Sequence, residues 1–408
     1  MRWIILVALY LIVDIYSYQA VRSFSRNWVV AAIYFLLSVI VVGNLIYQFN
    51  QPAPSGTFSG GRGYAIGIFL AFFVSKIVVS VMMLGEDVVR LPLAGIQNFF
   101  GSSDNFSVPS RRKFISTLAL GIAAIPFAGF LYGMFKGRYN FRVLKYTLHF
   151  DDLPDAFDGY RITQISDIHS GSFDHKEKIK YGVNLIQEQQ SDVIFFTGDL
   201  VNNMASEMED WKHMFSDLKA RHGVYSILGN HDYGDYHDWP SAEAKRENLK
   251  RLKQTHAEMG WDLLLNEHRY IEKEGERIAL VGVENWGAGG FKKAGDLKKA
   301  GENVKDEEFK ILLSHDPSHW NEEVKSFDKK YHLTLSGHTH GMQFGIEIPG
   351  WFKWSPIQYR YKQWAGIYEE AGRFINVNRG FGFLAYPGRV GIWPEISVIE
   401  LKKGPKPA

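Results

Sequence analysis

Long apolar segments fill the first third of the chain, whereas short apolar segments alternate with polar ones in the remainder. Crossing a lipid bilayer as a helix takes about 20 mostly apolar residues. Four segments are apolar enough and close to this length: residues 3–18, 28–47, 64–83 and 114–135. The pattern predicts a bundle of about four transmembrane helices within residues 1–136, followed by a water-facing domain of residues 137–408.

Aromatic residues at several segment ends, such as Trp3, Trp28 and Tyr47, suit the interfacial belt of a membrane protein. The first segment could instead be a signal peptide, but no clear small-x-small cleavage site follows it. Asp14 and Lys76 lie inside two of the segments. Because charges within a membrane are costly, we expect these two residues to pair or to reach the interface, with a functional role as the alternative.

The connector before the fourth segment contains Arg111, Arg112 and Lys113. Such a cluster should stay in the cytoplasm, and the arginine pair also resembles a twin-arginine export signal. A cytoplasmic cluster would place everything after the fourth segment outside the cytoplasm. Lys136 and Arg138, just beyond that segment, argue for the opposite orientation. We predict a multi-pass protein of the cell membrane with an extracytoplasmic C-terminal domain, a chance arginine pair in a loop being the alternative.

Short apolar strands and amphipathic helices alternate in the second region. Several strands are apolar throughout, as expected for strands buried on both faces, which predicts an α/β domain. The predicted strands are residues 143–150, 161–165, 193–197, 224–228, 278–283, 309–313, 331–335, 374–377 and 396–401, and the predicted helices are residues 176–189, 207–219, 242–258 and 318–327.

Charge and cysteine content narrow the classes of function. The net charge of +2 gives no electrostatic reason to expect nucleic acid as the main partner. The chain contains no cysteine, which excludes disulfides and thiolate metal sites. Any metal must therefore be held by His, Asp, Glu, Asn or backbone oxygens.

Polar clusters follow five of the predicted strands directly. One carboxylate after a strand is usually a turn or helix cap, but ligands of open α/β sheets bind at the carboxyl ends of strands. Five clusters in that position indicate one common site. The clusters contain Asp167 and His169; Asp199; Asn230, His231 and Asp232; His315; and His338 and His340.

Two Asp, one Asn and four His among these residues form a set of hard and borderline ligands. The set suits two divalent ions such as Mn, Fe or Zn, and suits Ca poorly. Two metals that share a carboxylate generate hydroxide near neutral pH and hold the oxygens of an in-line phosphoryl displacement. Glycines before Asp199, Asn230 and His338 allow sharp turns beside the ions.

The order Asp-x-His, Gly-Asp, Gly-Asn-His-Asp, a later His and Gly-His-Thr-His resembles the calcineurin-like metallophosphoesterases, over about residues 159–401. The resemblance implies a four-layer α/β/β/α sandwich with a binuclear metal centre. It also implies a metal-dependent phosphohydrolase in which a metal-bridging hydroxide attacks phosphorus.

The same resemblance assigns roles to individual residues. It implies that Asp199 bridges the two ions and that His231 binds no metal but contacts a phosphate oxygen or protonates the leaving group. Asp232 would orient His231 or cap a helix. The implied ligands are Asp167, His169 and His340 for one ion, and Asn230, His315 and His338 for the other.

After Asp199 the chain lacks the Arg-Gly of the protein Ser/Thr phosphatases, which disfavours a phosphoprotein substrate. The N-terminal membrane region and the arginine pair resemble instead the bacterial membrane-anchored branch. That branch includes twin-arginine-type phosphodiesterases and members that cleave the pyrophosphate of UDP-2,3-diacylglucosamine. The resemblance implies a phosphodiester, monoester or pyrophosphate substrate, with a lipid-linked pyrophosphate as one option.

An unusually aromatic stretch with interleaved cations lies at residues 351–364. It suits a loop that enters the headgroup region of membrane lipids, or an ordinary hydrophobic cover over the sheet edge. Arg379 and Arg389 could bind the substrate phosphate or pair with acids such as Glu395.

The sequence is also compatible with a second function, in which the protein binds metal but is not an enzyme. Asp14 and Lys76 would suit a membrane-tethered metal-binding sensor or transport partner without turnover. His231 argues against it, because a binding module has no need of a histidine beside the metals that holds neither of them.

Overall fold

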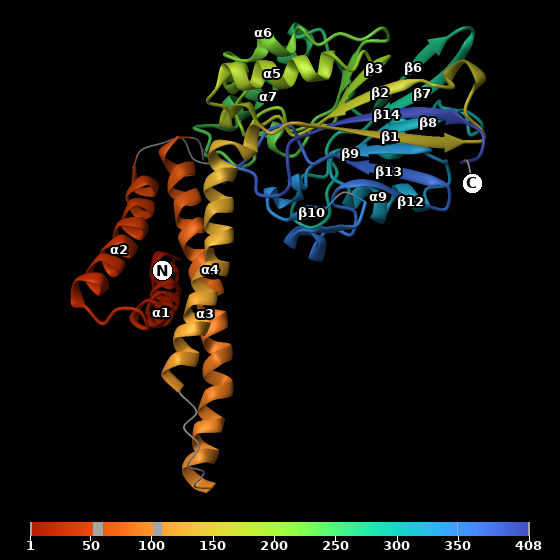
Figure 1. Cartoon of the computed structure of the whole chain (residues 1–408). Helices are drawn as coiled ribbons and strands as arrows, with labels where there is room; N and C mark the ends of the chain where they lie inside the picture. The colour runs from red at the N-terminus through yellow and green to blue at the C-terminus, as the bar shows by residue number, and fades with distance from the viewer. Residues whose placement is uncertain (1, 52–59, 101–107, 349, 407–408) are drawn as a thin grey trace. The chain divides into compact units, whose positions relative to one another are not determined.

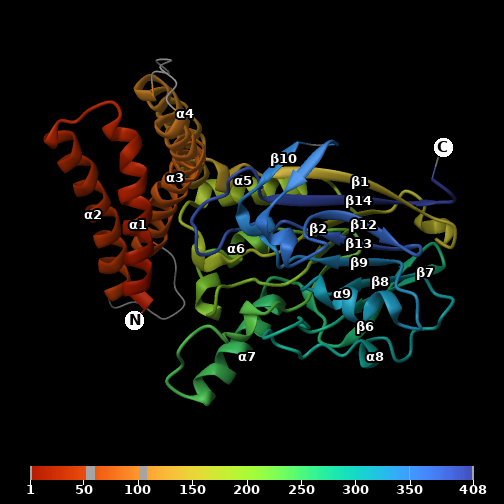
Figure 2. The same cartoon turned by 90° about the horizontal axis from the view of Figure 1, so that it is seen from below.

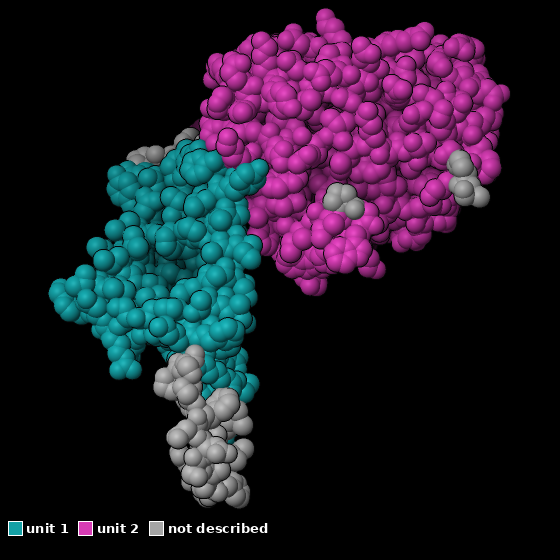
Figure 3. Space-filling model, in the orientation of Figure 1, with its two compact units in different colours: residues 1–52, 60–135 teal, residues 53–59, 136–408 magenta. Residues whose placement is uncertain are grey.

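The computed structural model describes residues 2–51, 60–100, 108–348 and 350–406. By its internal contacts the chain divides into a helical unit, residues 1–52 and 60–135, and a second unit that comprises residues 136–408 (Figure 3).

The helical unit consists of four helices, α1 (Arg2–Arg22), α2 (Trp28–Asn50), α3 (Gly61–Phe100) and α4 (Val108–Phe135). Each contains a candidate membrane span, the shortest of 20 residues and the longest, Gly61–Arg90, of 30. Apolar side chains such as Leu36 and Ile125 are 59% and 71% exposed, as lipid-facing residues must be. The four predicted transmembrane segments are thereby confirmed, and the third is longer than predicted.

Asp14 and Lys76, the two charges noted within the predicted membrane segments, pair with each other, as expected. The Lys76 ammonium lies 2.5 Å from Asp14 Oδ1 and also donates to Ser38 Oγ and Tyr10 Oη, at 2.6 and 3.0 Å. Arg112 likewise has partners within this unit, at 2.8 Å from Asp87 Oδ1. Packing of α4 against α3 therefore gives Arg112 a structural role.

The second unit contains two six-stranded sheets of mixed strand direction. The first runs in the order β1 (Arg142–Phe150), β14 (Glu395–Lys403), β2 (Arg161–Ile165), β3 (Val193–Phe196), β4 (Val224–Ser226) and β5 (Asp262–Leu263). The second runs in the order β12 (Gly366–Glu370), β13 (Arg373–Val377), β9 (Leu333–Ser336), β8 (Lys310–Leu313), β7 (Glu276–Gly282) and β6 (Glu267–Lys273). Strands β2, β3 and β4 are mutually parallel, as are β7, β8 and β9, so their carboxyl ends share one edge of each sheet.

Helices cover the outer faces of both sheets. Figure 1 shows α5 (Lys176–Gln187), α6 (Lys212–Phe215) and α7 (Ala242–Glu258) beside the first sheet, and α9 (Ser318–Glu322) beside the second, which α8 (Leu297–Ala300) also contacts. The predicted α/β/β/α layers are confirmed.

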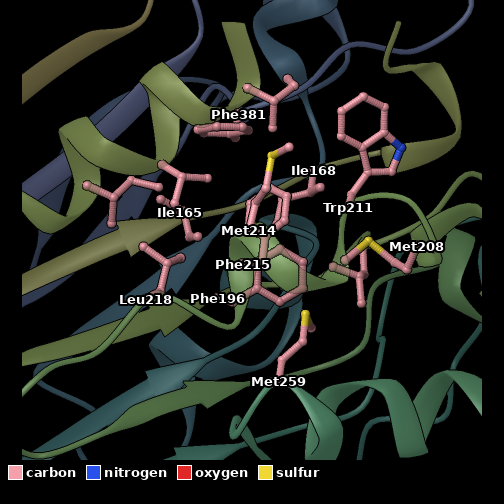
Figure 4. Packing of buried hydrophobic residues seen from close by; sticks show 14 of the residues in the cluster. Ile165, Ile168, Phe196, Met208, Trp211, Met214, Phe215, Leu218, Met259 and Phe381 are labelled. Atoms are coloured by element: carbon pink, nitrogen blue, oxygen red, sulfur yellow. The ribbon is translucent and has the colours of Figure 1, made fainter. Parts of the chain in front are cut away.

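Three buried clusters hold the layers together. Ile165 and Phe196 of the first sheet pack against Phe215 of α6 (Figure 4). Ile162 and Leu280 belong to the cluster that joins strands of the two sheets. A third cluster lies between the second sheet and helices α8 and α9. Strand alternation places neighbouring residues of each inner strand in different clusters, which is why these strands are apolar throughout.

The elements that the sequence did not predict are polar or very short. The predicted helix 207–219 is broken into a 3-10 turn, Ala205–Met208, and the four-residue α6, because apolar spacing marks a buried face without ensuring a continuous helix. Strand β6 is a sheet edge rich in charges, which hides the apolar signal of a strand. Strands β5 and β12 and the pair β10 (Ile346–Ile348) and β11 (Phe352–Trp354) were also not predicted.

Candidate metal centre

The five predicted clusters meet at one place. Two groups of buried side chains could each hold a cation, Asp167, His169 and His340 in one and Asp199, His315 and His338 in the other. A cavity of about 270 Å³ opens beside them. Its lining consists of His169, Asp199, Asn230, His231, Tyr236, Phe291, His338, His340 and Leu384.

The backbone turns sharply at this site. Five of the predicted site residues adopt left-handed backbone conformations, which non-glycine residues seldom do. Such strain concentrates at functional sites, where the surrounding structure holds it in place. These residues are Asp167 (φ 52°), His169 (φ 48°), Asp199 (φ 61°), His338 (φ 70°) and His340 (φ 49°).

The first group brings two imidazole nitrogens face to face. The Nε2 atoms of His169 and His340 lie 3.0 Å apart, and His340 Nε2 lies 3.2 Å from Asp167 Oδ1. His169 Nδ1 contacts Asn202 Oδ1 at 3.1 Å, and because the amide oxygen can only accept, Nδ1 carries the proton and Nε2 a lone pair. A lone pair directed at a carboxylate and a second imidazole fits a cation held among them.

The second group also brings a buried imidazole nitrogen close to a carboxylate. His315 Nδ1 donates to the Thr197 carbonyl oxygen at 2.7 Å. This leaves His315 Nε2 buried without a hydrogen-bond partner among the described residues, 3.2 Å from Asp199 Oδ2. His338 Nδ1 lies 2.8 Å from Asn230 Oδ1. A divalent ion would satisfy these converging atoms.

The second ring nitrogen of His338, Nε2, contacts two residues that do not belong to the metal-binding group. His338 Nε2 lies 2.9 Å from the Tyr361 hydroxyl and 3.4 Å from Asp316 Oδ2. A proton on Nε2 shared with these oxygens leaves Nδ1 as a ligand atom, the arrangement that metal-binding histidines usually have.

Electrostatics at the site favour ionised carboxylates. Burial raises the pKa of Asp199, but the imidazoles of His315 and His231 outweigh it and hold that pKa well below its usual range. Burial lowers the pKa of His169 and His338, so both are neutral near pH 7. Burial also lowers the pKa of His315, but Asp199 outweighs it and raises that pKa to about 10. Asp199 thus favours a proton on His315 Nε2. A bound metal ion would take the place of that proton.

His231 lines the cavity but belongs to neither metal group. Its backbone N–H donates to Asp199 Oδ1 at 2.8 Å, and its Nδ1 lies 2.8 Å from the carbonyl oxygen of Asn202. Since a carbonyl oxygen only accepts, Nδ1 is the donor, and Nε2 is the atom available to a ligand.

Asp232, for which the sequence predicts an orienting role toward His231 or a helix cap, contacts backbone groups in the structure. Its carboxylate accepts four backbone N–H groups. Oδ2 accepts from Gly229 and Asp199 at 2.8 and 2.9 Å, and Oδ1 accepts from Leu200 and Val201 at 2.8 and 3.3 Å. Asp232 therefore joins the loops after β3 and β4 and fixes the backbone that carries Asp199.

Arg379 and Arg389, predicted to bind the substrate phosphate or to pair with acids, both have partners within the protein. Arg379 is 4% exposed and pairs with Glu395 and, at 2.6 Å, with Glu347. Arg389 is fully buried and donates to backbone oxygens, including that of Gly382 at 2.6 Å. Neither lines the cavity. The predicted alternative, pairing with acids such as Glu395, is confirmed for Arg379.

Several cavity residues were not predicted from the sequence. The Tyr236 hydroxyl accepts from Asn230 Nδ2 at 3.0 Å, and Phe291 and Leu384 complete the lining. The Arg360 guanidinium lies 5.1 Å from the Phe291 ring centre. These residues lie on loops without a recognisable motif, so only the fold brings them to the site.

Comparisons with known proteins find related sequences for both parts of the chain. Residues 160–342 match the family described as calcineurin-like phosphoesterase, and residues 1–138 match one described as a probable calcineurin-like phosphoesterase transmembrane domain. The metallophosphoesterase YkuE of Bacillus subtilis is 29% identical over 72% of this chain and 98% of its own. The phosphodiesterase YaeI of Escherichia coli is 26% identical over 72% of this chain and 99% of its own.

The name of a vertebrate relative also combines the two regions. The zebrafish transmembrane protein with metallophosphoesterase domain is 28% identical over 67% of this chain and 60% of its own length. Among solved structures, the sulfate thiohydrolase SoxB of Thermus thermophilus aligns with a TM-score of 0.34 and 12% identity over 61% of this chain and 57% of its own. The family matches support a membrane protein that hydrolyses phosphoesters with divalent metals. This chain thus matches the calcineurin-like phosphoesterase family over residues 160–342 and a probable transmembrane domain of such phosphoesterases over residues 1–138.

Proposed function

We propose that this protein is a binuclear phosphohydrolase with two divalent ions, Mn, Fe or Zn, at the shared edge of its sheets. Asp199 supports the bridging role most directly, because its Oδ2 lies 3.5 Å from His169 Nε2 of one group and 3.2 Å from His315 Nε2 of the other. The proposed ligands are Asp167, His169 and His340 for one ion, Asn230, His315 and His338 for the other, and Asp199 for both.

When bound, such ions supply a nucleophilic hydroxide and neutralise charge on the transferred phosphoryl group. His231 then stabilises a phosphoryl oxygen or protonates the leaving group through Nε2. Because Nδ1 already donates to Asn202, Nε2 carries a proton only when the imidazole is positively charged. His231 is therefore proposed to act in its protonated form, which an anionic substrate would favour.

For the substrate, we propose a phosphodiester or pyrophosphate that is attached to a lipid. The exposed guanidinium of Arg360, beside Phe291 of the cavity lining, has no carboxylate within ion-pair distance among the described residues. An unpaired cation at this position suits an anionic group next to the reacting phosphorus. The four membrane spans keep the domain beside lipids.

The extracytoplasmic placement of residues 136–408 stays a proposal, supported by Arg111 and Arg112 at the start of α4. The chain has no cysteine, so Tyr181→Cys on the exposed surface of α5 gives a single labelling site. A membrane-impermeant maleimide should label this variant in intact cells. Labelling only after lysis would place the domain in the cytoplasm.

A sensor or transport partner without turnover remains the second candidate, favoured by the buried pair of Asp14 and Lys76. Metal content and turnover of the full-length chain separate the two candidates. We expect two metal ions per wild-type chain. His231→Ala should keep both ions and lose turnover, whereas the exposed-histidine control His213→Ala should change neither.

Equal turnover of His231→Ala and the wild type would refute the role of His231. One ion per chain, or none, in the folded wild-type protein would refute the binuclear centre.

A further inference from the structure

Strands β10 and β11 form a two-stranded antiparallel hairpin outside both large sheets. Figure 2 shows the hairpin running at an angle to the strands of the two sheets. A two-stranded hairpin is marginally stable by itself in water, so contacts of its two faces with other groups must stabilise it.

One face of the hairpin is polar and is held against the domain. Glu347 and Lys353 lie opposite each other in the register. Glu347 pairs with Arg379 at 2.6 Å, and the Lys353 ammonium donates to the Ala365 carbonyl oxygen at 2.6 Å. The charged residues of the hairpin are thus the ones with partners in the protein.

The other face is apolar and exposed. Ile348 lies opposite Phe352 in the register, and Ile346, Ile348 and Phe352 are 54%, 44% and 47% exposed. Trp351 and Tyr359 nearby are 81% and 80% exposed. This polarity is the reverse of what water favours, since alternation normally turns apolar side chains inward.

The hairpin starts close to the point where the chain enters the second unit. The N–H of Gly345 donates to the Val390 carbonyl oxygen at 2.9 Å. The neighbouring Arg389 carbonyl oxygen lies so close to Gly137 that a Cβ there would clash with it. Gly137 follows the end of the fourth candidate span, Phe135, by two residues. Because a residue adds at most about 3.6 Å of chain, the base of the hairpin lies within reach of the membrane surface.

We propose that the apolar face of the β10–β11 hairpin inserts into the interfacial region of the lipid bilayer. Trp351 lies at headgroup depth, where indole rings are favoured, and Ile346, Ile348 and Phe352 contact acyl chains. Of the two exposed cations on the following segment, Lys362 faces lipid phosphates, whereas Arg360 is assigned to the substrate above.

The segment that follows the hairpin also contacts the metal centre. Tyr361 lies between the two exposed cations and contacts His338 at 2.9 Å through its hydroxyl. The proposed membrane contact is therefore adjacent in sequence to a residue that contacts the metal centre.

Site-directed spin labelling of the full-length chain tests the proposal, since a single introduced cysteine is the only thiol. Trp351→Cys and, as a matched aromatic control on α5, Tyr181→Cys are labelled and reconstituted in vesicles of phosphatidylcholine and phosphatidylglycerol. Collision with oxygen, which concentrates in lipid, is compared with collision with a water-soluble nickel complex. The label at residue 351 should favour oxygen, and the label at residue 181 should favour nickel.

A nickel preference at residue 351 equal to that at residue 181 would overturn the proposal. Protection of residue 351 from both reagents, with spin–spin broadening, would also overturn it by showing that a second copy of the chain covers the hairpin. If Trp351→Cys fails to fold, Phe352→Cys supplies the same comparison.

Discussion

Replacing Asp232 by asparagine tests whether this carboxylate fixes the backbone of the metal site. Each oxygen of Asp232 accepts two backbone N–H groups. An asparagine side chain offers one oxygen and one NH₂ group, so in either orientation the NH₂ group faces two N–H donors.

The magnitude follows from that count. A buried N–H group left without an acceptor costs about 1–3 kcal/mol, so two of them cost about 2–6 kcal/mol. Folded domains have total stabilities of about 5–15 kcal/mol, so this loss is a large fraction of the whole. The loop that carries Asp199 should loosen as well, and metal affinity should fall with stability.

The assay is thermal unfolding of the full-length chain followed by tryptophan fluorescence, because most tryptophans lie after residue 136. Burial and Asp199 raise the pKa of Asp232 to about 7, so about pH 8 is used, where the carboxylate is ionised. Asp235→Asn is the matched control, because Asp235 pairs with Lys245 at the surface and its loss should cost less than about 1 kcal/mol.

Unfolding of Asp232→Asn at the temperature of the control would refute the backbone role. Unchanged stability combined with a lower kcat would instead support the orienting role toward His231 that the sequence suggested.

Three further predictions rest on other contacts. Arg379→Ala leaves the buried Glu395 without its cation and should cost about 3–5 kcal/mol of stability in urea unfolding, whereas a substrate role would change KM alone. His332 Nδ1 accepts the N–H of Lys310 at 2.9 Å, and burial lowers the His332 pKa from 6.5 to about 4. Protonation of His332 therefore favours the unfolded chain. The free energy of unfolding should be highest above about pH 6.5 and should fall by up to about 3 kcal/mol toward pH 4. In urea unfolding at several pH values, His332→Asn should show a weaker dependence on pH. Arg360→Ala should raise KM for an anionic diester with little change in kcat, and an unchanged KM would remove this residue from the proposed substrate contacts.

The sequence was sufficient for the features that depend on local pattern. Spans of apolar residues identified four membrane helices, and Asp167, Asp199 and His338 could be placed at strand ends because each follows an apolar strand directly. Parallel strands then bring their carboxyl ends together, so the convergence of the site follows from the topology.

Features that depend on long-range packing could not be predicted. Arg379 looks like a free cation in the sequence, and only the fold shows Glu347 and Glu395 beside it. Asp232 binds backbone N–H groups, which have no signature in the side-chain sequence. Phe291 reaches the cavity from the segment between β7 and α8, which carries no recognisable motif.

Hydrolysis of bis-p-nitrophenyl phosphate by the full-length chain is the most direct test of the proposed chemistry. The protein is stripped of metal and reloaded with Mn, with Asp199→Ala as the control, and the monoester analogue is assayed alongside. The proposed mechanism predicts turnover that requires both the metal and Asp199, with a diester-to-monoester ratio that reports the bond type. A folded, metal-loaded protein that cleaves neither substrate with any divalent ion would contradict it and favour the membrane-tethered sensor.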